Sequence, residues 1–193
     1  MSQPPPLPSV SIVVPVRDGW ESTLRCLTAL AIHSGGVRRE TIVVDNGSTD
    51  DTRVALPLLE GIRVIRNEED AGFARACNQA ASAALGDAIV FLDRSAEVGP
   101  GWLRQLAGVF AGEPVAAVCP SDESGLSGAF LAVRAGFFRD AGGLDEGRPD
   151  AADSLLAGFL EAGRRIGVVD GLAMTFGALP PPPSGAAAEA QVP

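Results

Sequence analysis

Short apolar segments alternate with longer amphipathic segments along the first two thirds of the chain. The apolar segments are rich in β-branched residues and end in acidic or turn-forming residues, which is typical of buried strands. We predict strands at residues 9–16, 40–45, 62–66, 88–93 and 115–119. Strands that alternate with helices favour a mostly parallel central sheet flanked by helices, so the predicted fold class is α/β.

The segments between these strands predict helices at residues 20–32, after Asp50, at 71–84 and from 100 to 110. In the first helix, an apolar stripe is expected from Leu24, Leu27, Leu30 and Ala31. Beyond residue 120 the pattern is looser. It predicts a strand at 128–133, a helical turn at 135–141, a helix at 151–162 and a last strand at 166–169.

A length of 193 residues suits one domain, which we place at residues 9–177. A Pro-rich extension, residues 1–8, precedes it, and a Pro- and Ala-rich tail, residues 178–193, is expected to be disordered. No apolar stretch reaches the ~20 residues of a membrane span, and the N-terminus does not resemble a targeting segment. We therefore expect no transmembrane segment and a cytoplasmic location.

The composition excludes several kinds of site. The net charge is −9 and no basic cluster is present, so nucleic-acid binding is not expected. Every basic residue is Arg, which excludes a Walker phosphate loop and Schiff-base chemistry through Lys. The one histidine, His33, is expected to end a helix, and the three cysteines form no C-x-x-C motif.

Candidate ligand residues follow three of the predicted strands. The first strand ends in Pro15, Val16, Arg17 and Asp18, the second in Asp45 and the fourth in Asp93. In an open α/β sheet, ligands bind outside the carboxyl ends of the strands. The sequence therefore predicts a nucleotide pocket at this edge of the sheet.

Four segments carry a resemblance to a known family. They are VSIVVPV at 10–16, IVVDNGSTD at 42–50, the stretch from Asn67 through GFARACN at 72–78, and SGAF at 127–130 with GGLDE at 142–146. Together they resemble the family 2 glycosyltransferases of the GT-A fold, particularly the rhamnosyltransferase-like branch. The resemblance covers roughly residues 9–177.

The resemblance implies transfer of a sugar from a nucleotide-diphospho-sugar to a hydroxyl acceptor. It implies that Asp45 accepts a hydrogen bond from a base N–H, which favours a UDP- or dTDP-type donor. Taken alone, the segment around Asp45 could also be an Asx turn with a helix cap. Asn78 could contact the ligand or tie down a neighbouring loop.

The stretch after the fourth strand departs from the family pattern. The family places a D-x-D-like motif there, whose carboxylate holds Mn²⁺ or Mg²⁺ against the donor diphosphate. Here Asp93 remains, but Ser95 stands where the metal-binding carboxylate is expected, and a hydroxyl is a weaker ligand for a hard cation. A metal ion is therefore only weakly supported. Arg94 could neutralise the diphosphate instead, or form an ion pair with Asp93 or Glu97.

The predicted general base also departs from the pattern. The family supplies this carboxylate from a Glu-Asp pair, and counting back from Gly163 places that pair at Ala151 and Ala152. We take Asp153 as the candidate catalytic base and expect Asp150 to cap the helix. Two functions stay open: a glycosyltransferase, or a catalytically reduced module of the same fold that binds a nucleotide or a protein partner without turnover.

Overall fold

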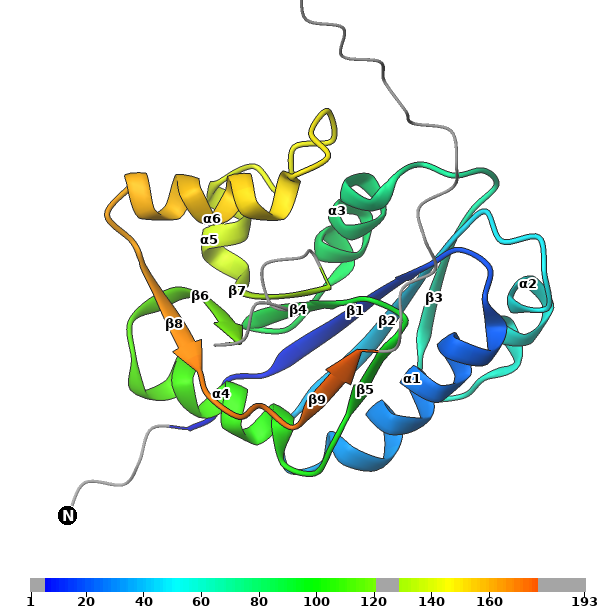
Figure 1. Ribbon diagram of the computed structural model, residues 1–193, viewed down its shortest axis with the longest axis horizontal. Coiled ribbons are helices and arrows are strands. Elements are labelled where there is room, and N and C mark those ends of the chain that lie inside the picture. The colour runs from blue at the N-terminus through cyan, green and yellow to red at the C-terminus, as the bar shows by residue number, and fades with distance from the viewer. Residues whose placement is uncertain (1–5, 121–128, 177–193) are drawn as a thin grey trace, which may run out of the picture.

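A central sheet of seven strands organises the molecule, in the order β3-β2-β1-β4-β7-β6-β8 (Figure 1). The structure is a computed structural model and describes residues 6–120 and 129–176. The strands are β1 (Val10–Val16), β2 (Arg39–Asn46), β3 (Arg63–Asn67), β4 (Ala88–Leu92), β6 (Val115–Pro120), β7 (Phe130–Arg134) and β8 (Arg165–Val169). The four strands β3-β2-β1-β4 are mutually parallel, so their carboxyl ends share one edge of the sheet. Strand β7 is antiparallel to both β4 and β6.

Helices cover both faces of the sheet, as the alternating pattern predicts. They are α1 (Trp20–His33), α2 (Thr52–Ala55), the 3₁₀ helix η1 (Leu56–Leu58), α3 (Phe73–Ala83), α4 (Trp102–Gly112), α5 (Ala135–Asp140) and α6 (Ala151–Glu161). Helices α1 and α4 pack on one face, where Trp102 contributes a fully buried side chain. Helices α3, α5 and α6 pack on the other face (Figure 1). Side chains alternate along a strand, so Ile12 joins the first core and Val13 the second.

The predicted strands and the long helices agree with the observed elements to within about two residues at most ends. The apolar stripe of α1 was misplaced. Leu27 and Leu30 are buried, but Leu24 is 40% exposed and Ala31 is also exposed. The buried face consists of Thr23, Cys26, Leu27 and Leu30, which follow the i, i+3, i+4, i+7 spacing of one helix face.

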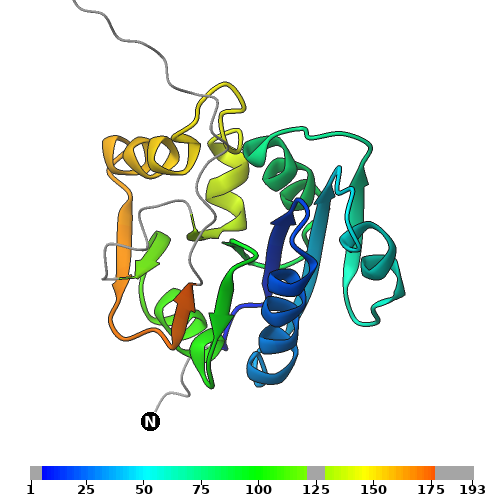
Figure 2. The ribbon, with the colours of Figure 1, turned by 45° about the vertical axis from the view of Figure 1, so that its right-hand side comes forward.

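A second, two-stranded sheet was not predicted. It pairs β5 (Ala96–Val98) with β9 (Met174–Phe176) in antiparallel register. Figures 1 and 2 both show β9, in orange, beside β5. Three-residue strands are too short for a periodic pattern, so sequence reasoning has no signal for them. Pairing with β9 fixes the chain immediately after the Asp93–Ser95 turn.

Five predictions fall wholly or partly outside the described residues. These are most of the Pro-rich extension, the first residue of the strand at 128–133, the first two residues of the SGAF segment, the last residue of the domain at 9–177, and the disordered tail. In the described part of the chain, no helix is both long enough and apolar enough to cross a membrane.

Candidate functional site

The loop after β1 is held against the loop after β2 by backbone-to-carboxylate hydrogen bonds. The Oδ1 atom of Asp18 accepts hydrogen bonds from the backbone N–H of Thr49 at 2.7 Å and of Asp50 at 3.2 Å. In return, Gly19 donates its N–H to Asp50 at 2.7 Å. Asp18 has a positive φ of 54°, which these bonds stabilise. The bond from Thr49 also lowers the pKa of Asp18.

Asp45, the predicted base-binding residue, is almost completely buried at the end of β2, with 1% of its surface exposed. Its Oδ1 accepts a hydrogen bond from the Ser48 N–H at 2.9 Å, and its Oδ2 forms an ion pair with Arg66 at the end of β3. Both carboxylate oxygens therefore have partners within the protein. The bond comes from the N–H three residues on, so it closes a loop one residue longer than an Asx turn, and base recognition by Asp45 stays a prediction.

Arg17 belongs to a second set of polar contacts between strand ends. Its guanidinium forms an ion pair with Asp70, in the loop between β3 and α3. Asp70 also accepts a hydrogen bond from the Asn46 side chain at 2.6 Å. Asn46 in turn accepts one from the Asn67 side chain at 2.9 Å. The charge of Arg17 is thus compensated within the protein.

The turn after β4 brings Asp93, Arg94 and Ser95 to the same edge. The Oδ1 atom of Asp93 accepts the Ser95 N–H at 2.7 Å, while the Ser95 hydroxyl is buried and has no partner among the described residues. Arg94 donates its Nε–H to the backbone carbonyl of Asp18 at 3.3 Å. The expected alternative for Arg94, an ion pair with Asp93 or Glu97, is absent from the described part of the chain. Glu97 pairs instead with Arg25 at 3.3 Å.

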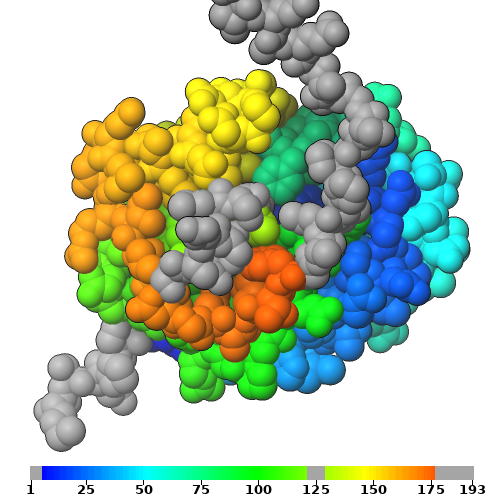
Figure 3. Space-filling view, viewed as in Figure 1, coloured from blue at the N-terminus to red at the C-terminus, as the bar shows by residue number. Residues whose placement is uncertain are grey.

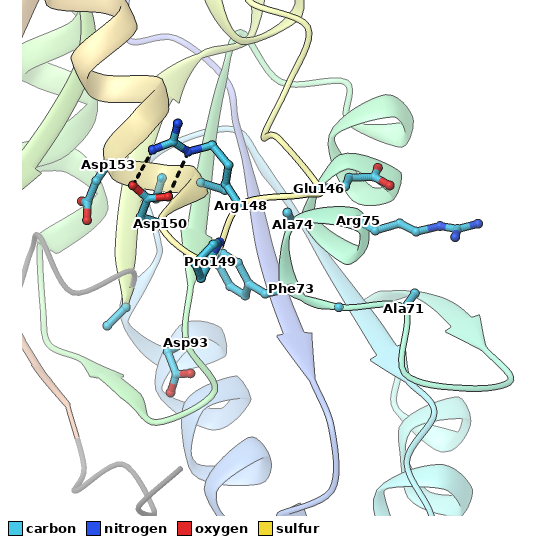
Figure 4. A pocket seen from close by; sticks show the side chains of 14 residues that line it. Ala71, Phe73, Ala74, Arg75, Asp93, Glu146, Arg148, Pro149, Asp150 and Asp153 are labelled. Atoms are coloured by element: carbon cyan, nitrogen blue, oxygen red, sulfur yellow. Dashed lines mark hydrogen bonds and ion pairs between the residues drawn. The ribbon is translucent and has the colours of Figure 1, made fainter. Parts of the chain in front are cut away.

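A cavity of about 400 Å³ opens between the end of β4, the start of α3 and the start of α6. Its polar lining consists of Arg75, Asp93, Glu146, Arg148, Asp150 and Asp153 (Figure 4). Asp93 and Asp153 are 60 residues apart in sequence, and the fold brings both to this cavity. Ala151 and Ala152 line it as well, at the positions where the family resemblance implies carboxylates.

The two aspartates at the start of α6 have different surroundings. Asp150 occupies the N-cap position, as predicted, but its side chain makes no capping hydrogen bond. It accepts two hydrogen bonds from Arg148, at 3.0 and 2.8 Å, and these lower the pKa of the Asp150 carboxyl. Asp153 is exposed and accepts no hydrogen bond from the described residues. Figure 4 shows the Arg148–Asp150 pair as dashed lines, with Asp153 beside it.

The other predicted site residues do not line this cavity. Pro15, Val16, Arg17, Asp18, Asp45, Arg94 and Ser95 all lie outside it. Two hydrogen bonds link this group to the cavity. Arg94 donates to the Asp18 carbonyl, and the Ser95 N–H donates to Asp93, which lines the cavity. Sequence reasoning missed Arg148, which lies outside every quoted segment, and Arg75, a position of the GFARACN segment to which no role was assigned.

Asn78 ties down a loop, which was one of its two expected roles. Its side-chain Nδ2 donates to the Leu144 carbonyl at 2.8 Å, and its Oδ1 accepts the Leu144 N–H at 2.9 Å. The bonds join α3 to the loop before α6, and Figure 3 shows these two segments, green and yellow, as neighbours at the surface. Asn78 thereby fixes one wall of the cavity.

The residues at the turn after β4 fit a divalent cation poorly. Across residues 6–120 and 129–176, no group of three or more His, Cys, Asp or Glu side chains is placed to hold a metal ion. Asp93 is a single carboxylate, and the neutral Ser95 hydroxyl adds no charge. Mn²⁺ and Mg²⁺ favour several oxygen ligands that include carboxylates, so this turn is a weak site for them.

Comparison of the sequence with known proteins identifies the family of this chain. Residues 11–142 match glycosyl transferase family 2. Curated relatives include polypeptide N-acetylgalactosaminyltransferase 3 of Taeniopygia guttata, 32% identical over 60% of this chain, and polypeptide N-acetylgalactosaminyltransferase 10 of Homo sapiens, 31% identical over 59%. The chain spans about one fifth of the length of these relatives, 20% in each case. The rhamnosyltransferase-like branch stays a prediction.

Solved structures share the fold. A mannosyltransferase from Pyrobaculum calidifontis, in complex with GDP-Man and Mn²⁺, superposes with a TM-score of 0.77 at 20% identity, over 88% of this chain and 56% of that one. TarS of S. aureus in complex with UDP gives a TM-score of 0.75 at 18% identity, over 86% of this chain and 59% of that one. The α/β fold is therefore the GT-A fold, as expected. With the match over residues 11–142, these findings show that the chain belongs to glycosyl transferase family 2.

Proposed function

We propose that this chain binds a nucleotide-diphospho-sugar and transfers its sugar to a hydroxyl acceptor. The observation that carries this proposal is the cavity that Asp93 and Asp153 line together. It lies at the carboxyl edge of the parallel strands, where open α/β sheets bind ligands. Family membership and the complexes of the neighbouring structures with GDP-Man and UDP support a donor of this class.

In this proposal Asp153 acts as the general base. It takes the proton of the acceptor hydroxyl while the acceptor oxygen forms a bond to the anomeric carbon. The bond from that carbon to the diphosphate breaks, and its electron pair leaves with the diphosphate. Asp153 suits this role better than Asp150, because the Arg148 guanidinium stabilises the charged form of Asp150 and makes it a weaker base.

We place the nucleotide end of the donor at the ends of β1 and β2. There Pro15, Val16, Arg17 and Asp18 are the proposed contacts of the nucleotide, and Asp45 is the proposed partner of the base. We propose a UDP- or dTDP-type donor, because a carboxylate accepts the N3–H of uracil or thymine. A cytoplasmic location belongs to the same proposal, and three buried cysteines without a disulfide are compatible with a reducing compartment.

The test is release of free nucleoside diphosphate from UDP-, dTDP- and GDP-sugars in the presence of a panel of hydroxyl acceptors. We expect wild-type protein to release UDP or dTDP, and Asp153→Asn to lower the rate by about 100-fold or more. Asp140→Asn, an exposed aspartate on α5 outside the Asp93–Asp153 cavity, is the matched control and should retain the wild-type rate. Equal rates in wild type and Asp153→Asn would refute the role of Asp153.

A second function rests on a separate observation. Ala151 and Ala152 line the cavity where the family resemblance implies the catalytic Glu-Asp pair. This favours a module that binds the nucleotide, or a protein partner, without turnover. Nucleotide binding without release of nucleoside diphosphate from any sugar nucleotide would support the module over the enzyme.

A further inference from the structure

The arginines at the carboxyl edge of the sheet differ in how their charge is compensated. Arg17 pairs with Asp70 and Arg66 pairs with Asp45, so neither carries free charge to a ligand. Arg94 is half-buried and has no ion-pair partner among the described residues. Among the described residues its guanidinium makes one hydrogen bond, through Nε–H, and both terminal nitrogens are available to a ligand.

The position of the Arg94 guanidinium is closely defined. A Cβ atom added to Gly19 would lie 3.0 Å from Nε and 3.2 Å from Nη2 of Arg94, so the guanidinium lies across the backbone of Gly19. This places its charge between the loop after β1 and the turn after β4. Both segments belong to the proposed donor site.

The nearby carboxylates are directed elsewhere. The Asp18 side chain accepts from the Thr49 and Asp50 backbone, and Asp50 accepts from Gly19 and Trp20. Asp93 accepts from Ser95. None of the three forms an ion pair with Arg94 in the part of the chain that the structure describes.

We infer that the diphosphate of the donor is bound by the Arg94 guanidinium, and that this binding requires no divalent cation. The inference rests on the proposed function, since it concerns the same donor. A guanidinium donates two parallel hydrogen bonds to phosphate oxygens and offsets their charge. The same turn offers a metal ion only Asp93 and a neutral hydroxyl, so Arg94 supplies the positive charge at this turn.

Binding of UDP, dTDP and GDP, and of their nucleosides, tests the inference by isothermal titration calorimetry in EDTA and in Mn²⁺. We expect wild-type protein to bind its preferred nucleoside diphosphate with the same Kd in both conditions. Arg94→Ala should raise that Kd by about 10- to 100-fold, as expected for loss of a charge-assisted bidentate contact. The Kd for the corresponding nucleoside should not change, since it has no diphosphate. For the nucleoside diphosphate, the Kd of Arg94→Lys should lie between the Kd of wild type and that of Arg94→Ala.

The control is Arg25→Ala, which removes an exposed arginine of α1 that pairs with Glu97. It should bind like wild type. Weaker nucleoside binding by Arg94→Ala would mean that Arg94 only supports the loop through the Asp18 carbonyl. Loss of wild-type binding in EDTA, or an unchanged Kd in Arg94→Ala, would overturn the inference and leave the proposed function standing. If wild-type protein binds no nucleotide in EDTA and none in Mn²⁺, both the inference and the proposed function are overturned.

Discussion

Three aspartates near the ends of β1 and β2 and one aspartate at the start of α6 have opposite environments. At the ends of β1 and β2, Asp18, Asp45 and Asp50 bind backbone N–H groups or a guanidinium of neighbouring segments. At the start of α6, Asp153 is exposed and free of hydrogen bonds from the described residues. The residue type is the same, yet the first three carboxylates hold neighbouring segments together and the Asp153 carboxylate does not.

The difference separates stability from chemistry. A buried carboxylate with two partners fixes loop geometry, and its removal leaves those partners unsatisfied. An exposed carboxylate in a cavity contributes little to folding. Its removal therefore changes the free energy of unfolding little and is expected to change turnover instead. Substitution of the aspartates with protein partners should therefore lower the free energy of unfolding, whereas substitution of Asp153 should lower the rate of turnover.

The largest expected effect on stability is that of Asp45→Ala. It leaves the Arg66 guanidinium and the Ser48 N–H without their acceptor in a buried setting. We expect the free energy of unfolding to fall by about 3 kcal/mol, near the lower end for a broken buried pair because Arg66 is 27% exposed. Urea unfolding measures this loss. Asp153→Ala is the comparison and should change the free energy of unfolding by less than about 0.5 kcal/mol. Similar losses in both variants would contradict the difference in stability between the paired Asp45 and the exposed Asp153.

A smaller effect is expected from Gly47→Ala, which tests how tightly the loop after β2 packs. Gly47 has a φ of 79°, and an added Cβ would lie 2.7 Å from the backbone carbonyl carbon of Glu69. Positive φ and a backbone contact both oppose the substitution, so we expect a loss of about 2 kcal/mol. Gly108→Ala in α4 meets no atom within 4 Å and should gain about 0.5–1 kcal/mol. Thermal unfolding of both variants gives the comparison; a Gly47→Ala variant as stable as wild type would show that the loop is loosely packed.

The fold was predictable because its strands are strongly apolar and its helices long. The small sheet of β5 and β9 was not, since pairing of Val98 with Met174 depends on contacts across 76 residues. The same limit applies within the site. Asp45 could be marked as a candidate from its motif, but its pairing with Arg66 follows from the register of β2 and β3.

The start of α6 illustrates the limit further. Counting back from Gly163 left Asp150 and Asp153 on either side of the missing pair, and the structure places both in the lining of the cavity. Arg148 escaped notice, because its effect on Asp150 comes from a loop geometry that no spacing rule encodes. Motifs locate the elements that carry a site, whereas charge compensation among side chains has to be observed.

The smallest expected effect concerns acid stability and the loop after β1. The hydrogen bond from the Thr49 backbone lowers the pKa of Asp18 below the 3.8 that is usual for Asp. A carboxyl whose pKa is lower in the folded state stabilises the fold at pH values above its unfolded pKa, and this contribution is lost as the pH falls through the folded pKa. Asp18→Asn should therefore be less stable than wild type at pH 7, and the gap should narrow as the pH drops below about 4. Urea midpoints at pH 7, 4 and 3 measure it, with Asp140→Asn as the exposed control. A gap that stays constant with pH would mean that the charge of Asp18 adds nothing, and that the amide holds the Thr49 N–H equally well.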